Sequence, residues 1–223
     1  MTRTRIKFCG MMRPQDVATA AAVGADAIGM VFYSAAPRHV TIEQAKKMID
    51  VLPPFVTPVG LFVDSPAEEV AQISRQLNLG HVQLHGRESP ELVSQLKSLN
   101  IVKAVHVDAK LRGTLANWRA AIADMQLTNI KGILLETGAT GAAGGTGAVN
   151  DWEAIAAAQR SGAFDGLPPL IVAGGLTPEN VGTVIEQLRP FAVDVSSGIE
   201  SSRGVKSAEK MRAFVAAVGG SSC

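Results

Sequence analysis

The chain of 223 residues is long enough to bury one sizeable core, and its length fits one domain better than two. Its 21 basic and 20 acidic residues nearly cancel, which argues against nucleic acid or an anionic membrane as the main partner, and its 4% aromatic content argues against platforms for stacking bases. No segment approaches the ~20 consecutive apolar residues of a membrane span, and the amino-terminal residues lack the apolar region of a secretory signal.

The two cysteines, Cys9 and Cys223, are too few for a disulfide framework. They lie near opposite ends of the chain, and the sequence alone leaves a bridge between them open. This cysteine usage is typical of a protein of the reducing cytoplasm, which is where we expect this chain to be located.

In chain order, short β-rich apolar runs alternate with segments of helical periodicity. Several of the runs are apolar without interruption, which indicates strands that are covered on both faces. The eight candidate strands are RIKFCG (5–10), AIGMVF (27–32), VTPVGLFV (56–63), HVQLHG (81–86), IVKAVHV (101–107), KGILLE (131–136), PLIVAGG (169–175) and FAVDVSS (191–197).

The helical segments between the strands carry recognisable start signals. Thr41–Gln44 and Ser65–Glu68 have the pattern of capping boxes, the second with Pro66 in the favoured first helical position. Ser89 and Thr177 each precede a proline in the same way. Apolar residues at helical spacing follow these signals, and the stripes are Ile42, Ala45, Met48, Ile49 and Leu52; Val70, Ile73 and Leu77; and Val181, Val184, Ile185 and Leu188.

Eight strands alternating with helices are compatible with two architectures, a doubly wound open sheet and a closed (β/α)8 barrel. Eight compact units in one short domain favour the barrel. An open-sheet nucleotide binder is also expected to carry G-x-G-x-x-G after its first strand, and the sequence there reads FCGMM (8–12). We therefore predict an α/β fold, a single (β/α)8 TIM barrel over residues 1–223, with about 215–223 as a flexible tail.

The site of such a barrel lies at the carboxyl ends of its strands, and the loops after strands seven and eight usually bind phosphate. Here those loops contain Gly174 and Gly175, and then Ser196, Ser197 and Gly198. Glycines let backbone N–H groups approach an anion closely. The alternative is that the glycines only make tight turns, but the two loops together predict a phosphate site.

Cys9 ends the first strand and Glu136 ends the sixth, so both side chains can project into the barrel mouth. An acid and a thiol on nearly opposite sides of a sugar can protonate one atom and deprotonate its neighbour, provided that the thiol is available as thiolate. By residue type alone Cys9 is more often a small buried hydrophobe, and Glu136 has the alternative of a solvated loop carboxylate. Their positions at strand ends favour catalytic roles.

Arg38, in the loop after the second strand, can clamp a carboxylate with two parallel hydrogen bonds, and a surface arginine is an equal alternative on sequence alone. Gln83 and His85 lie on one face of the fourth strand, and we assign them to substrate positioning. No spacing typical of metal ligands, P-loops or serine hydrolases occurs, so no metal is expected. The glycine-rich segment 137–150 is interpreted as a flap over the site.

These motifs resemble those of the phosphoribosylanthranilate isomerase family, and they follow the family's order from residue 5 to about residue 215. The matching segments are KFCGM (7–11), DAIGMVF (26–32) with Pro37 and Arg38, VQLHG (82–86), GGTG (144–147) with Asp151 and Trp152, GGL (174–176), PENV (178–181) and VDVSSGIE (193–200).

The resemblance implies an Amadori rearrangement in tryptophan biosynthesis, in which N-(5-phosphoribosyl)anthranilate becomes 1-(2-carboxyphenylamino)-1-deoxyribulose 5-phosphate without a cofactor or metal. It implies that an acid at the end of strand six opens the ribose ring and that Cys9 removes the proton from sugar C2. Arg38 would hold the anthranilate carboxylate, the last two loops the phosphate, and Asp194 the sugar or the amine. The sequence leaves open whether the protein is a monomer or a homodimer.

Glu136 departs from the family pattern, in which the acid is normally the aspartate of an L-L-D sequence. The reference pKa values of the two residue types differ little, at about 3.9 and 4.3. The extra methylene displaces the carboxyl group by roughly an ångström, however, and such a misplacement can cost about 10²-fold in rate. Our hypothesis is that Glu136 still serves as the acid.

Two rival functions stay open at this point. The enzymatic rival is another phosphate-binding barrel, such as a bifunctional sugar isomerase or an epimerase relative, although an epimerase would need metal-binding histidines at its strand ends. The other rival is a barrel that binds a phosphorylated small molecule without turnover, with Glu136 marking lost activity. The convergent polar groups of the rim argue against the second rival.

Overall fold

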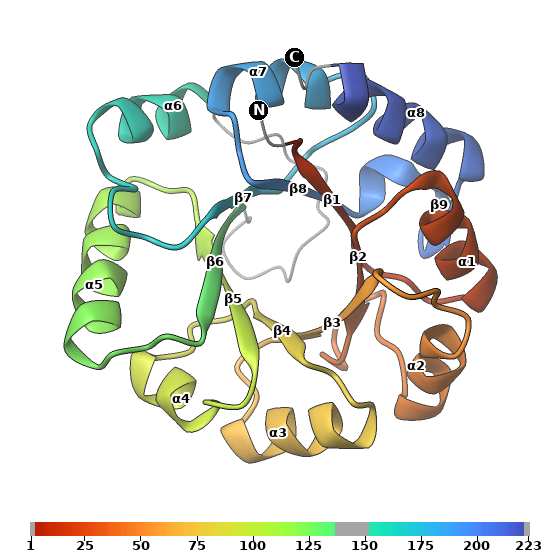
Figure 1. Ribbon diagram of the computed structural model, residues 1–223, viewed down its shortest axis with the longest axis horizontal. Helices are drawn as coiled ribbons and strands as arrows, with labels where there is room; N and C mark the ends of the chain where they lie inside the picture. Colours follow the sequence, from red (N-terminus) through yellow and green to blue (C-terminus); the bar gives the residue numbers. More distant parts are fainter. Residues whose placement is uncertain (1–2, 137–151, 221–223) are drawn as a thin grey trace.

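The structure, a computed structural model, describes residues 3–136 and 152–220. Within these ranges eight parallel strands form a closed barrel in chain order, and helices surround it (Figure 1). The predicted (β/α)8 barrel and all eight predicted strands are therefore confirmed. The strands are β1 Arg5–Phe8, β2 Ala27–Val31, β3 Thr57–Phe62, β4 His81–Leu84, β5 Asn100–His106, β6 Ile130–Glu136, β7 Leu170–Val172 and β8 Ala192–Val195.

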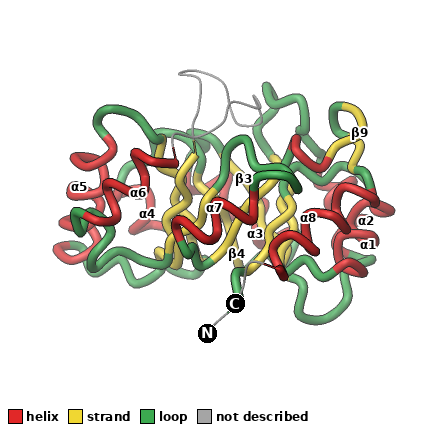
Figure 2. Tube along the Cα trace, turned by 90° about the horizontal axis from the view of Figure 1, so that it is seen from above, coloured by secondary structure: helices red, strands yellow, loops and turns green. Residues whose placement is uncertain are grey.

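The helices form a layer outside the barrel wall, as the edge-on view in Figure 2 shows. They are α1 Pro14–Val23, α2 Ile42–Ile49, α3 Ala67–Gln76, α4 Pro90–Gln95, α5 Leu111–Asp124, α6 Trp152–Arg160, α7 Val181–Leu188 and α8 Ala208–Gly220. Between β8 and α8 the chain forms a 3-10 turn, η1 Ser197–Ile199, and a small antiparallel pair, β9 Glu200–Ser202 and β10 Val205–Lys206. In Figure 2 β9 lies at one rim of the barrel.

The barrel closes where the first strand pairs with the last. β1 and β8 are parallel, and their register places Arg5 opposite Ala192 and Lys7 opposite Asp194. Because side chains alternate between the two faces of a strand, Lys7 and Asp194 both project into the barrel while Ile6 and Phe8 project outward.

Apolar side chains fill both faces of the wall. Outside, Phe8 packs edge-to-face on Phe214 of α8, with ring centroids 5.9 Å apart, as part of the large core between strands and helices. Inside, a separate small cluster consists of Ala104, Leu134, Ile171, Ala173 and Ala192. This double coverage explains why the strands read as continuous apolar runs.

The predicted helix starts at Thr41 and Ser89 are confirmed, because in both cases the helix begins at the next residue. Thr41 Oγ1 accepts from the Gln44 backbone N–H at 3.2 Å, and Gln44 Oε1 accepts from the Thr41 backbone N–H at 2.8 Å, which confirms the first capping box. Ser89 caps α4 in the same sense, with Pro90 as its first residue. The stripe of α7 is fully buried, as expected.

Two predicted helix starts and the predicted flexible tail are wrong. Pro66 has an extended ψ of 145°, so α3 begins one residue later and Ser65 lies too early to cap it. Asn180 Oδ1 accepts from the Thr177 backbone N–H at 2.8 Å, and this turn delays α7 to Val181. The tail expected from about 215 is helical up to Gly220, because Val218 continues the buried face of α8, and 221–223 lie outside the described residues.

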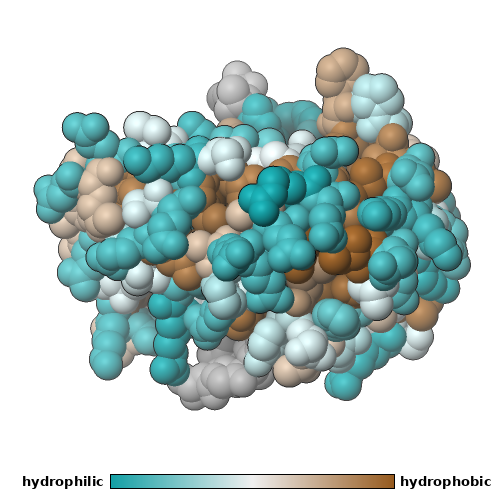
Figure 3. Space-filling view, turned by 90° about the horizontal axis from the view of Figure 1, so that it is seen from below, coloured by the Kyte–Doolittle hydropathy of each residue, from teal (hydrophilic) through white to brown (hydrophobic). Residues whose placement is uncertain are grey.

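The flank of the barrel in Figure 3 is covered largely by hydrophilic residues with hydrophobic ones between them, as expected of helices that bury one face. Among the described residues, no helix combines the length and apolar character needed to cross a membrane.

Candidate active site at the carboxyl rim

The carboxyl ends of the parallel strands bring the predicted site residues together at one rim of the barrel. Six of these side chains are buried and polar or ionisable, an unusual concentration inside a protein. They are Cys9, Arg38, Gln83, His85, Glu136 and Asp194.

Cys9 directly follows β1 and points into the barrel beside Gly29 of β2. A Cβ atom on Gly29 would lie 2.7 Å from Cys9 Sγ and 3.2 Å from Lys7 Nζ, so both groups occupy the space that this glycine leaves free. Burial raises the pKa of the Cys9 thiol above its usual value, and the positive charge of Lys7 opposes that rise. The thiol therefore depends on Lys7 for access to its thiolate form.

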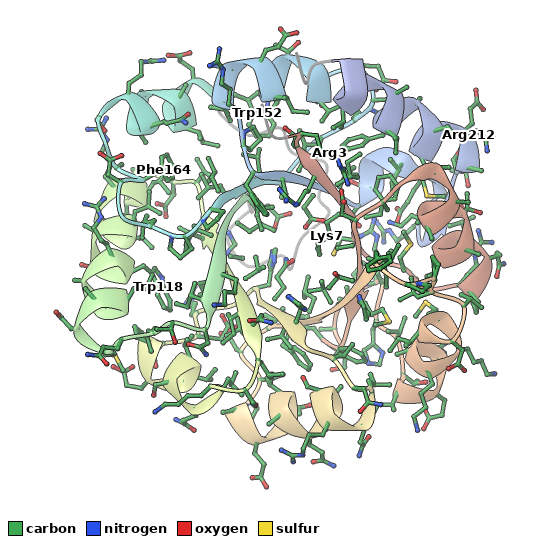
Figure 4. All side chains as sticks on the ribbon, in the orientation of Figure 1. Arg3, Lys7, Trp118, Trp152, Phe164 and Arg212 are labelled. Carbon is green, nitrogen blue, oxygen red and sulfur yellow. The ribbon has the colours of Figure 1, made fainter. Side chains whose placement is uncertain are left out.

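Lys7 is a site residue that sequence reasoning missed. Its Nζ donates to Asp194 Oδ2 at 2.9 Å, and Figure 4 places Lys7 on β1 at the inner side of the wall. Burial alone would lower the pKa of Lys7, but Asp194 and Cys9 raise it overall, so the lysine stays charged. A usable signal existed, since Lys7 precedes Cys9 by two residues and must share its face of the strand.

Asp194 bonds to Lys7 through one of its two carboxylate oxygens, Oδ2. Its Oδ1 is buried and accepts no hydrogen bond from the described residues. A buried carboxylate oxygen normally has a donor, so this atom is a candidate acceptor for a substrate N–H or O–H.

Glu136, at the end of β6, contacts His85 Nε2, and His85 Nδ1 accepts from Gln83 Nε2 at 2.7 Å. Burial would raise the pKa of Glu136, but its hydrogen bond with His85 and its electrostatic interactions with His85, His106 and Lys7 hold that pKa below its usual range. Gln83 and His85 share one face of β4, as predicted. Gln83 Oε1 is buried and has no partner among the described residues.

Arg38 makes the bidentate bond expected of it, but the acceptor is Glu200. Its Nε and Nη2 donate to the two Glu200 carboxylate oxygens, each at 2.7 Å. The hydrogen bond to Glu200 raises the pKa of Arg38 despite burial, and Glu200 is held below its usual pKa although burial alone would raise it. The pair leaves Arg38 Nη1 for another acceptor.

Lys206 completes this group from β10. Its Nζ donates to Glu200 Oε1 at 3.0 Å and to the backbone oxygen of Ser196 at 3.0 Å. Glu200 appeared in the sequence only as part of a longer motif, and nothing local marked Lys206. The geometry of Gly10 also matters here, because a Cβ atom at that position would lie 2.5 Å from Arg38 Cδ.

The two loops predicted to bind phosphate lie against each other. Gly174 and Gly175 have φ of 86° and 68°, which is the left-handed region that favours glycine. A Cβ atom on Gly198 would lie 1.9 Å from the Leu176 backbone oxygen, so only glycine fits where the loops meet. Ser196 and Ser197 lead from β8 into η1 beside this contact.

Another buried ion pair, formed by Lys103 and Glu88, supports the rim next to the site. Glu88 accepts from Lys103 Nζ at 2.8 Å and from the backbone N–H groups of Asp64 and Gly86 at 3.0 and 2.9 Å. Burial would raise the pKa of Glu88, but Lys103 and these donors lower it, whereas for Lys103 burial outweighs Glu88 and lowers the pKa. The pair ties together the loops that follow β3 and β4.

The proposed flap, 137–150, lies outside the described residues. Within the ranges that are described, no three histidine, cysteine or acidic side chains are grouped so that they could hold a metal ion.

A closed barrel of eight βα units with convergent ionisable side chains at the carboxyl rim defines the class of (β/α)8-barrel enzymes. Residues 6–217 match the family model of N-(5'-phosphoribosyl)anthranilate (PRA) isomerase. The chain belongs to this isomerase family, which acts in tryptophan biosynthesis.

Individual relatives agree over nearly the whole chain. An N-(5'-phosphoribosyl)anthranilate isomerase of Pseudomonas aeruginosa (strain UCBPP-PA14) is 43% identical, covering 98% of this chain and 96% of the relative. The crystal structure of phosphoribosyl anthranilate isomerase from Thermotoga maritima has a TM-score of 0.84 at 34% identity, covering 97% of this chain and 99% of that one.

Another solved isomerase of this name was crystallised in complex with reduced 1-(o-carboxyphenylamino)-1-deoxyribulose 5-phosphate. It has a TM-score of 0.81 at 33% identity, covering 97% of this chain and 99% of that one.

Proposed function

We propose that the protein converts N-(5'-phosphoribosyl)anthranilate into 1-(2-carboxyphenylamino)-1-deoxyribulose 5-phosphate by general acid–base catalysis. The observation that carries the mechanism is the placement of a thiol beside a lysine and a carboxyl group beside a histidine at the same rim. The related isomerase in complex with a reduced form of this product supports the choice of substrate.

Glu136 is the acid of the first step. Its carboxyl proton passes to the ribose ring oxygen, the bond from that oxygen to C1 breaks, and the anilino nitrogen lone pair forms a C1=N double bond. The result is an open-chain Schiff base.

Cys9 is the base of the second step. Its thiolate takes the proton from C2, and the C2–H electrons form a C1=C2 bond while the C1=N electrons return to nitrogen. The enolamine then tautomerises to the ketone by gaining a proton at C1 and losing one from the C2 hydroxyl. Gains and losses of protons cancel, as an isomerisation requires.

The resting protonation states are the reverse of those that the steps need. Burial favours the Cys9 thiol, and His85 favours the Glu136 carboxylate. The active form, with thiolate and carboxylic acid, holds the same number of protons as the resting form, so it is a minor but constant fraction between the two pKa values. Lys7, by stabilising the thiolate, increases that fraction.

Binding uses the remaining groups of the rim. The loops with Gly174, Gly175 and Ser196–Gly198 hold the phosphate, and Arg38 holds the anthranilate carboxylate through the nitrogen outside its pair with Glu200. Asp194 Oδ1 accepts from the amine or a sugar hydroxyl. Gln83 and His85 complete the wall beside Glu136.

The protein is proposed to act as a homodimer in the cytoplasm, where Cys9 stays a free thiol. A related isomerase from Thermotoga maritima is described as dimeric. In the connection between α2 and β3, Phe55 is 99% exposed, and this connection lies at the end of the barrel opposite the site. A second copy of the chain would cover this side chain.

The direct test is loss of the fluorescence of phosphoribosylanthranilate when purified protein is added. We expect turnover by the wild type, a fall of about 10²-fold or more in Cys9→Ala, and wild-type turnover in the control Cys223→Ser. Complementation of a tryptophan auxotroph that lacks this isomerase gives the same comparison in cells. Turnover by Cys9→Ala at the wild-type rate would refute Cys9 as the base, and no turnover by the wild type would refute the function.

A further inference from the structure

Gln83, His85 and Glu136 form one hydrogen-bonded row across β4 and β6. An amide nitrogen only donates, so the 2.7 Å bond makes His85 Nδ1 an acceptor. A neutral His85 then carries its proton on Nε2 and donates it to Glu136 Oε2. In this arrangement Glu136 is the carboxylate, which is the form that cannot act as the acid.

When Glu136 is protonated, the hydrogen bonds of this row must run in the opposite direction. Its O–H must donate to His85 Nε2, so the ring proton must move to Nδ1, and Nδ1–H then needs an acceptor. The alternative state, a protonated His85 ring next to a Glu136 carboxylate, holds the same number of protons. Its Nδ1–H also needs an acceptor. Gln83 Oε1 belongs to the same amide group, is buried, and has no partner among the described residues.

We propose that Gln83 is a positioning residue whose side-chain amide turns over when the His85–Glu136 pair takes up a proton, so that Oε1 replaces Nε2 on His85 Nδ1. This inference rests on the proposed role of Glu136 as the acid. It assigns Gln83 to control of the acid, whereas its residue type and strand position had suggested only contact with substrate.

The proton balance is closed. One proton from solvent adds at His85 Nδ1 as the amide turns, and the proton on Nε2 passes to Glu136 Oε2. Delivery of that proton to the substrate ring oxygen leaves Glu136 as carboxylate. His85 then carries one ring proton, on Nδ1. When this proton returns to Nε2 and the Gln83 amide turns back, the starting state is restored.

The surroundings allow both orientations. Gln83 is completely buried, and turning its amide exchanges an oxygen for an NH2 group of similar size within the same volume. In the observed orientation Oε1 has no partner among the described residues, so no hydrogen bond to that oxygen holds the amide in place. The other titratable groups that act on Glu136 are His106 on β5, whose ring centroid lies 6.4 Å from that of His85, and Lys7 on β1.

The test reads the His85 tautomer by NMR of protein labelled with ¹⁵N in its histidine rings. The chain has four histidines, and loss of one signal set in His85→Asn assigns His85. In free wild-type protein at alkaline pH we expect Nε2 protonated and Nδ1 bare. Because this measurement needs no turnover, it stands even if the isomerase activity is absent. Protonated Nδ1 in that sample would overturn the proposal.

Two variants of Gln83 extend the test. Gln83→Glu offers only acceptors, so Nδ1 should become protonated and the acid limb of the kcat/KM profile should move to higher pH. Gln83→Met has similar length but neither donates nor accepts, and we expect kcat to fall by about tenfold or more, a part of the ~10²–10⁴ that proton transfer contributes. Circular dichroism confirms folding. A wild-type pH profile in Gln83→Glu, or wild-type turnover in Gln83→Met, would show that Gln83 only packs.

Discussion

Lys7 and Asp194 are register partners across the seam where β1 meets β8, and their side chains form a 2.9 Å ion pair inside the barrel. The first and last strands thus place a cation next to the proposed base. Asp194 competes with the Cys9 thiolate for that cation, since its own charge raises the pKa of the thiol while Lys7 lowers it. The pair therefore sets how much thiolate the site contains.

Removing the Lys7 charge should make Cys9 harder to ionise. Lys7→Met leaves the burial of Cys9 and the negative charge of Asp194, both of which raise the thiol pKa. At a fixed pH near neutrality, alkylation of Cys9 by iodoacetamide should slow by about tenfold or more. The alkaline limb of kcat/KM, which reports Cys9, should move to higher pH while the plateau falls, because the thiolate fraction shrinks.

The control for this prediction is Lys7→Arg, which keeps the charge and should retain most of the alkylation rate. Both variants are best made in a Cys223→Ser background, so that Cys9 is the one thiol present. Equal alkylation rates in Lys7→Met and Lys7→Arg would contradict the assigned role of the charge.

Glu136 should tolerate loss of length better than loss of ionisation. Glu136→Gln keeps the size but has no proton to donate, so kcat should fall by about 10²–10⁴-fold. Glu136→Asp keeps the acid but withdraws it from His85, and a fall of up to about 10²-fold is expected from misplacement. Steady-state kinetics of the wild type, Glu136→Gln and Glu136→Asp test this prediction. Near-wild-type turnover of Glu136→Gln would show that Glu136 is not the acid.

Glu200 should affect binding more than chemistry. Glu200→Gln keeps a hydrogen bond to Arg38 but not the charge or the bidentate geometry. We expect KM to rise by about tenfold, which corresponds to ~1.4 kcal/mol, with a smaller change in kcat. Glu200→Asp, which retains the charge, is the matched comparison. A fall in kcat at unchanged KM would place Glu200 in the chemical steps instead.

The ion pair of Lys103 with Glu88 should matter for stability. Both side chains are almost fully excluded from solvent, with 3% and 0% exposed. Lys103→Met leaves the Glu88 carboxylate buried without its cation, which should cost about 3–5 kcal/mol of unfolding free energy. The double variant Lys103→Met/Glu88→Gln should recover part of that loss in urea denaturation. A loss below about 1 kcal/mol in the single variant would contradict the prediction.

Phe55 should govern the oligomeric state. Its ring is almost fully exposed, and contact with a second copy of the chain would remove that apolar surface from water. Light scattering after size exclusion should give about twice the 23.3 kDa chain mass for the wild type and the chain mass for Phe55→Ser. Isomerase turnover should persist in the variant, and a wild type that is monomeric at all concentrations would refute the dimer.

The amino-acid sequence by itself determined the order of eight strands alternating with helices, and with it the rim at which Cys9, Glu136 and the glycine loops meet. This information is local. Apolar runs reveal strands, and the two-residue period of a strand places Gln83 with His85 on one face. Local signals failed where one backbone angle decided the outcome, as at Pro66.

Only the tertiary structure decided which of these groups bond to one another. Arg38 was expected to clamp a carboxylate, and the carboxylate it holds is that of Glu200, 162 residues away. Lys7 meets Asp194 because the barrel closes in one particular register. Such pairings depend on the stagger between strands, which is set by packing over the whole barrel rather than by neighbours in sequence, and that is why the sequence located the rim but not its network of charges.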